Sequence, residues 1–89
     1  MPAPDRQEFQ IEADTDLDVL LRILGPFAVQ GAELVDVRHA LSEEGAWTVI
    51  EATGLEPERA ELLRLRLLQV PSVRGVRLRP CLALVGAAK

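Results

Sequence analysis

Three aspartates at alternate positions, Asp14, Asp16 and Asp18, form the densest group of chemically useful side chains in the sequence. Carboxylates that converge in this way can coordinate a cation or hold an ammonium group. Acids at this spacing also suit the first turn of a helix, where the helix dipole favours negative charge. An apolar pattern of helical period follows them. We therefore interpret the cluster as a helix N-terminus, with cation or ammonium binding as the alternative.

Other residues that could support catalysis are scarce. The chain has one histidine, His39, and one cysteine, Cys81. These two residues cannot form a metal site alone, and no nucleophile, base and orienting acid can be assembled around them. The sequence also lacks a glycine-rich phosphate-binding motif. We expect a non-catalytic protein with no cofactor and no metal, in which His39 is structural or exposed. A small enzyme that uses the acidic cluster and His39 is the catalytic alternative.

Composition excludes several classes of protein. The 89 residues are 48% apolar and 27% charged, with a net charge of −4. These values indicate one soluble globular domain and exclude a disordered chain. An acidic chain does not suit the phosphate backbone, so we expect no nucleic-acid partner. Because the sequence has neither an apolar stretch of membrane-spanning length nor an apolar signal segment, we expect a cytoplasmic protein with no membrane partner.

Apolar periodicity predicts the elements of the first half of the chain. Alternation predicts strands over residues 8–13 and 32–40, with Val35 and Val37 on one face of the second strand. Between them, helical spacing predicts one buried stripe. We expect Asp14 or Thr15 to cap this helix, Pro26 to kink or loosen its last turn, and Gly31 to end it in the left-handed conformation. The stripe comprises Leu17, Leu20, Leu21, Leu24, Phe27 and Ala28.

The second half of the chain repeats this plan. Residues 42–45 are typical of a hairpin turn, and residues 46–53 alternate as a strand that places Trp47 and Val49 on the same face. Pro57 suits the first position of a helix that extends to about residue 70. A last strand is predicted over residues 73–79. The core stripe of the second helix is expected to comprise Ala60, Leu63, Leu67 and Val70.

The element order βαββαβ predicts an α+β, ferredoxin-like fold, which is a four-stranded antiparallel sheet with two helices on one face. We place the domain at residues 8–79, between a flexible N-terminal tail at residues 1–7 and a C-terminal tail at residues 80–89. The first and last strands are neighbours in this fold, so outward Glu8 and Glu12 should lie across from Arg77 and Arg79. Such pairing accounts for an uneven charge distribution. Residues 1–58 hold thirteen acids and three arginines, whereas residues 59–89 hold one acid and seven bases.

Two apolar features exceed what one small core requires. Trp47 and Val49 fall on the sheet face that the predicted helices leave uncovered. The second helix carries leucines around its whole circumference, so Leu62 and Leu65 point away from the core. Large apolar side chains gathered at a surface mark interaction sites. We therefore expect these four residues to contact a protein partner.

Three stretches of sequence resemble a known family. Residues 21–34, LRILGPFAVQGAEL, resemble the first helix and second strand of ACT domains. Residues 55–60, LEPERA, and residues 70–76, VPSVRGV, flank a leucine-rich helix and resemble the second helix and last strand of that family. Within the family, the resemblance is greatest to the small regulatory subunit of acetohydroxyacid synthase. It implies a regulatory or assembly module that forms a homodimer, either free-standing or beside a larger catalytic subunit of an amino-acid biosynthetic enzyme.

ACT domains commonly bind an amino-acid effector between protomers, and the resemblance assigns this role to two segments of the chain. However, Asp18 and Glu33 stand where the family commonly has glycine and asparagine. At about 4 Å near a protein surface, a like charge costs a bound carboxylate about 4 kcal/mol. The implied alternatives are a pairing module without a ligand and an amino-acid sensor with its ligand at the dimer interface. The candidate ligand-binding residues are Asp14, Thr15, Asp16, Asp18, Gly31, Ala32 and Glu33.

Overall fold

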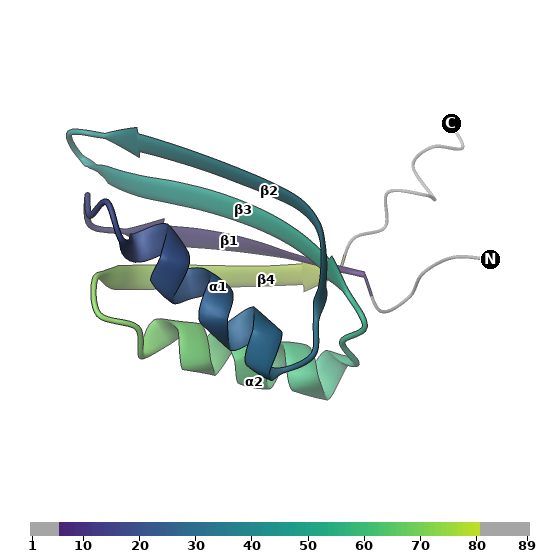
Figure 1. Cartoon of the computed structure of the whole chain (residues 1–89). Helices are drawn as coiled ribbons and strands as arrows, with labels where there is room; N and C mark the ends of the chain where they lie inside the picture. The colour runs from purple at the N-terminus through teal and green to yellow at the C-terminus, as the bar shows by residue number, and fades with distance from the viewer. Residues whose placement is uncertain (1–5, 81–89) are drawn as a thin grey trace.

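A computed structural model of the chain describes residues 6–80 and confirms the predicted fold. The sheet has four strands in the order β2-β3-β1-β4, and every neighbouring pair is antiparallel. Both helices lie on one face of this sheet (Figure 1). Residues 1–5 of the predicted N-terminal tail and residues 81–89 of the C-terminal tail, with Cys81, lie outside the described residues. The elements in chain order are β1 (Gln7–Ala13), α1 (Val19–Val29), β2 (Glu33–Ser42), β3 (Gly45–Thr53), α2 (Pro57–Leu68) and β4 (Val73–Pro80).

Turn and cap residues end the elements where their chemistry requires it. Gly31 has φ +76°, the left-handed conformation that closes a helix. The backbone N–H of Ala32 donates to the carbonyl of Phe27, and that of Gly31 donates to Ala28, as in a Schellman motif. Pro57 occupies the first turn of α2, where a missing N–H costs nothing. These caps and the hairpin between β2 and β3 were predicted from sequence and are confirmed.

The core lies between the sheet and the helices. Phe9 of β1 and Phe27 of α1 meet edge to face, with ring centroids 4.9 Å apart and planes at 80°. An aromatic pair in this geometry contributes about 0.5–1.5 kcal/mol beyond the burial of its area. The alternation of β3 is confirmed, because its helix-facing side chains are buried. The remaining large core side chains are Ile11, Val19, Ile23, Ile50, Leu55, Leu63 and Leu67.

The predicted start of α1 is wrong, and its predicted buried stripe is confirmed only at Phe27, which is buried, and at Leu24, which packs against the core. The helix begins at Val19, and its N-cap position is Asp18, which makes no side-chain cap hydrogen bond. Its buried face consists of Val19, Ile23 and Phe27, whereas Leu17 and Leu21 are 83% and 71% exposed. The side of α1 that faces the sheet runs through Val19, Ile23 and Phe27, which are four residues apart and share one face of the helix.

Pro26 lies inside α1, and the helix continues through it to Val29. Proline donates no backbone hydrogen bond, so the carbonyl of Arg22 loses its usual partner four residues along the helix. At its C-terminus, α2 ends at Leu68, before the predicted residue 70. Neither helix within residues 6–80 is long and apolar enough to span a bilayer.

As predicted, β1 and β4 are neighbouring strands, but only some of the predicted residue pairs between them occur. Glu8 faces Arg79, and the arginine Nε donates to the Glu8 carboxylate at 2.6 Å. Glu12 faces Gly75 rather than an arginine, and Arg77 faces Gln10. The sequence predicted which strands would be neighbours, but their relative register could not be read from alternation alone.

Candidate ligand loops and interaction surfaces

The loop between β1 and α1 carries the acidic cluster, and its carboxylates bind other parts of the chain. The Nε of Arg74 donates to the Asp14 carboxylate at 2.7 Å. The Asp16 carboxylate accepts from the backbone N–H of Asp18 at 2.9 Å, and from Ser72 and Arg22, each at 3.2 Å. These bonds tie the loop to α1 and to the start of β4. The cluster therefore serves as a structural joint within each chain.

Electrostatics keep Asp16 ionised in this joint. The backbone N–H of Asp18 lowers the pKa of the Asp16 carboxyl, and the Ser72 hydroxyl and the Arg22 guanidinium lower it further, against an opposing effect of burial. A carboxyl with a lowered folded-state pKa stabilises the fold above its ordinary pKa and loses that contribution as pH falls through the folded value. The Asp16 carboxylate is therefore charged at neutral pH.

The predicted caps of α1 are engaged elsewhere. The Thr15 hydroxyl donates to the carbonyl of Ser42 at 2.7 Å, and Asp14 is held by Arg74. Neither residue stands at the N-cap position, which is Asp18, because the helix begins only at Val19. Among residues 6–80, no three histidine, cysteine or acidic side chains lie close enough together to hold a metal ion.

The second candidate ligand segment, Gly31 to Glu33, lies at the other end of α1. A helix of 11 residues is about 16 Å long, so the two segments are separated by that length within one chain. Gly31 is exposed, and a Cβ atom placed on it would meet nothing within 4 Å. The two predicted halves of a ligand site are therefore not brought together by one copy of the fold.

His39 lies inside β2, opposite Thr48 of β3. Its Nδ1 is 2.8 Å from the Thr48 hydroxyl oxygen, and Thr48 is almost fully buried. This contact satisfies a polar group that would otherwise be costly to bury. His39 makes no hydrogen bond to the acidic cluster, which is occupied by Arg74, Ser72 and Arg22.

The four predicted partner-contact residues lie on opposite sides of the molecule. Trp47 is 42% exposed and faces away from the helices, with the half-buried Val49 beside it on β3. Leu62 and Leu65 are exposed on α2, away from the core. Because the sheet and helix layers separate the two pairs, one flat interface cannot bury all four side chains.

The strand β2 presents an apolar surface that the sequence analysis did not single out. Leu34, Val37 and Leu41 face buried β3 residues across the strand pair, yet they remain 43%, 38% and 43% exposed. The two helices lie over the β1 and β4 side of the sheet, so β2 is left at an uncovered edge (Figure 1). The alternation from Val37 to Leu41 was the available signal for this face.

The comparisons with known proteins agree with this architecture. A family model described as an ACT-like domain matches residues 3–85. The chain belongs to the ACT-like domain family. Domains of this family are typically regulatory and non-catalytic. No curated protein sequence matches the chain.

Solved structures of other proteins share the fold. The ACT domain of a GTP pyrophosphokinase from Chlorobium tepidum aligns with a TM-score of 0.74 and 11% identity, covering 83% of this chain and 96% of that one. The C-terminal domain of the MgtC protein from Mycobacterium tuberculosis aligns with a TM-score of 0.71 and 14% identity, covering 91% and 92%. An uncharacterised protein from Thermotoga maritima aligns with a TM-score of 0.65 and 13% identity, covering 84% and 94%. At these identities the likeness is one of fold.

Proposed function

We propose that this ACT-like domain is a non-catalytic regulatory module that pairs with a second copy of itself through the edge of β2. We call this surface the β2 edge and define it by Leu34, Val37 and Leu41. The observation that carries the proposal is the contrast across the β2–β3 pair. The β3 partners Ala46, Ile50 and Ala52 are buried, whereas the β2 side chains that face them are exposed.

The backbone of β2 supports the same interpretation. In the described sheet, β2 pairs with β3 alone, so its other edge offers unpaired N–H and C=O groups. A long edge strand with exposed apolar side chains is a template for a further strand. β2 is ten residues long and contains neither proline nor lysine, which commonly block such pairing. A two-fold pair would join both sheets and cover both apolar edges with one contact.

A larger enzyme subunit is part of this proposal. In this proposal the module acts by binding a larger catalytic subunit, and the resemblance of residues 21–34 and 55–76 favours an enzyme of amino-acid biosynthesis as that subunit. Pairing at the β2 edge leaves the exposed Leu62 and Leu65 of α2 free for that contact. This surface lies on the helix layer, whereas the paired edge lies at one side of the sheet (Figure 1).

Replacing Val37 by lysine is expected to weaken the pair. The substitution removes an apolar contact at the centre of β2 and places a charge beside its two-fold copy. The dissociation constant of the pair should rise at least about tenfold, which corresponds to about 1.4 kcal/mol. Sedimentation velocity over a concentration series measures this change.

Leu62→Glu is the matched control, because it charges an exposed leucine on α2 and should leave pairing unchanged. If the parent protein is monomeric at high micromolar concentration, pairing is ruled out. If Leu62→Glu dissociates the pair and Val37→Lys does not, the contact lies on the helices instead of the β2 edge.

An amino-acid effector at the paired interface is the second candidate function. Pairing about a two-fold axis beside β2 sets the two α1 helices antiparallel. The acidic loop of one copy then lies on the same side as the Gly31 turn of the other. The exposed backbone at Gly31 favours this candidate, since a ligand could approach it without meeting a side chain.

Thermal unfolding in the presence of each of the twenty amino acids tests the effector. A ligand at a hundredfold excess over its dissociation constant stabilises the folded state by about 2.7 kcal/mol. For a chain of this size, that free energy raises the melting temperature by roughly 10–20 °C. Val37→Lys should abolish the shift if the ligand lies between copies. A panel without any shift would exclude the effector and leave the pairing module.

A further inference from the structure

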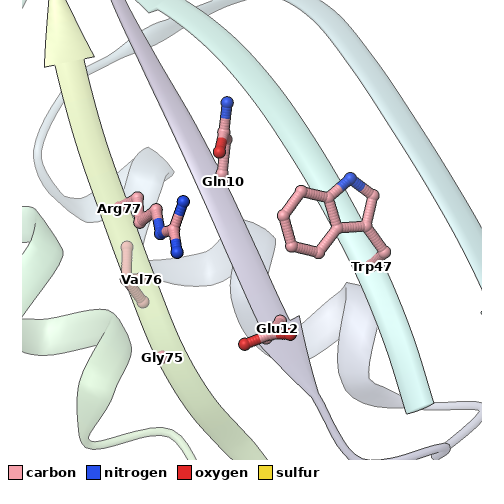
Figure 2. A pocket seen from close by; sticks show the side chains of 6 residues that line it. All are labelled: Gln10, Glu12, Trp47, Gly75, Val76 and Arg77. Carbon is pink, nitrogen blue, oxygen red and sulfur yellow. The ribbon is translucent and has the colours of Figure 1, made fainter. Parts of the chain in front are cut away.

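The sheet face opposite the helices contains a hollow of about 330 Å³. This volume is at the lower end of the range of small-molecule sites. The hollow spans three neighbouring strands, β3, β1 and β4, as Figure 2 shows. Pairing at the β2 edge would not cover it. We call it the open-face hollow, and its lining residues are Gln10, Glu12, Trp47, Gly75, Val76 and Arg77.

Strand register explains why a hollow forms at this point of a flat sheet. Trp47, Glu12 and Gly75 lie in one row across β3, β1 and β4. Gly75 has no side chain, so the position on β4 beside Glu12 is left empty on this face. A Cβ atom on Gly75 would lie 4.0 Å from a Glu12 carboxylate oxygen, with no closer neighbour. A glycine within a strand often marks a place where another group comes close to the backbone.

Charge pairing sets the open-face hollow apart from the rest of this face. Arg79 bonds Glu8 at 2.6 Å, Arg6 bonds Glu51 at 2.8 Å, and Arg38 bonds Asp36 at 3.0 Å. Across the residues that the structure describes, Glu12 and Arg77 make no such ion pair. They are placed diagonally on adjacent strands, since Glu12 faces Gly75 and Arg77 faces Gln10.

The third component of the hollow is apolar. The indole of Trp47 extends from β3 toward β1, Gln10 and Glu12 project from β1 itself, and Arg77 lies on β4, on the far side of β1 from the indole (Figure 2). An exposed indole provides apolar contact area and can also attract a cation to its ring face. The open-face hollow therefore combines a free carboxylate, a free guanidinium and an aromatic wall.

We propose that the open-face hollow binds a small zwitterion that carries an apolar group. Its ammonium group is held by Glu12, its carboxylate by the Arg77 guanidinium, and its apolar part by Trp47. Arginine is suited to this role because its planar fork can donate two parallel hydrogen bonds to one carboxylate. Such a ligand would form ion pairs with both Glu12 and Arg77, whereas a simple anion or cation can pair with only one of them. This site is independent of pairing at the β2 edge and of any ligand there.

Trp47 reports directly on binding, because it is the only tryptophan of a chain without tyrosine. We expect its fluorescence to change saturably when the full chain is titrated with L-leucine or glycine betaine. Leucinamide lacks the carboxylate and N-acetyl-leucine lacks the ammonium group. Each should bind at least about tenfold more weakly than leucine, since a charge-assisted hydrogen bond is lost. Comparison of leucine with betaine distinguishes an ammonium that donates hydrogen bonds from one that contacts only the indole.

Variants locate the response within the open-face hollow. Glu12→Gln and Arg77→Gln should each weaken binding at least about tenfold, and Gly75→Val should abolish it by filling the hollow. Arg79→Gln is the matched control, because it removes a paired arginine from the same strand and should leave binding unchanged. Val37→Lys should also bind normally, which separates this site from a ligand at the β2 edge.

Three results would overturn the proposal. The first is the absence of a saturable change up to about 10 mM ligand, a tenfold excess over a dissociation constant of about 1 mM. The second is equal binding of leucine and its two blocked derivatives. The third is a Trp47 signal that depends on protein concentration and not on ligand, which would make this face a contact between copies.

Discussion

Replacing Phe27 by alanine is expected to lower the free energy of unfolding by about 3–5 kcal/mol. Phe27 is fully buried in α1 and meets Phe9 of β1 edge to face, so its removal leaves a cavity between the helix and sheet layers. A domain of 89 residues has a total stability of roughly 4–13 kcal/mol. This substitution therefore removes a large share of it. Urea unfolding followed by circular dichroism measures the loss.

Leu21→Ala is the matched control for Phe27→Ala. Both side chains belong to the same helix, and sequence periodicity placed both in one buried stripe. Leu21 is 71% exposed, so its truncation should change stability by no more than about 0.5 kcal/mol. If the two variants lost comparable stability, α1 would have to pack through the stripe predicted from sequence, and Val19 and Ile23 would not form its buried face.

The fold could be predicted because local signals at each level agree. β3 alternates buried and exposed side chains along its length, as its sequence does. Gly31 and Pro57 mark a helix end and a helix start through backbone preferences that do not depend on the rest of the protein. Such signals set the order βαββαβ, and the packing rules for split βαβ units then leave few arrangements of the sheet.

The helix start was mispredicted because tertiary hydrogen bonds compete with local capping. Asp14 and Thr15 have the side chains of good N-caps, but each bonds to a distant residue, Arg74 or the carbonyl of Ser42. These partners lie 60 and 27 positions along the chain. No window of sequence around residue 15 contains that information, so the helix was expected to begin too early.

The surfaces behind both proposals depend on strand register, which a single sequence specifies poorly. The β2–β3 register shifts between Leu34 and Asp36, so Val35 is passed over and the predicted shared face of Val35 and Val37 does not follow from simple alternation. On the other side of β1, the register with β4 runs unbroken from Gln7 to Glu12 and sets Glu12 opposite Gly75. Alternation gave the face of most side chains, but the register of each strand pair decides which residues meet across strands.

Replacing Gly45 by alanine is expected to cost about 2–4 kcal/mol, because two unfavourable effects combine. Gly45 has φ +156°, a conformation that residues with a side chain rarely adopt. A Cβ atom there would also lie 2.6 Å from the carbonyl oxygen of Ala13 and 2.9 Å from a guanidinium nitrogen of Arg74. The arginine can move, but the backbone oxygen belongs to the end of β1 and cannot move without disturbing the sheet. Thermal unfolding measures the cost.

The Gly45→Ala substitution should also destabilise the β1–α1 loop, which holds the acidic cluster. Strain confined to residue 45 would not have this effect. Arg74 bonds both the Asp14 carboxylate and the carbonyl of Glu44, so a side chain at residue 45 displaces the group that ties the β2–β3 hairpin to the β1–α1 loop. Amide exchange in that loop should therefore accelerate in Gly45→Ala. Gly75→Ala is the control, since its Cβ meets only a flexible carboxylate at 4.0 Å, and it should leave stability and exchange nearly unchanged. Faster exchange confined to the hairpin would show that Arg74 does not couple the two loops.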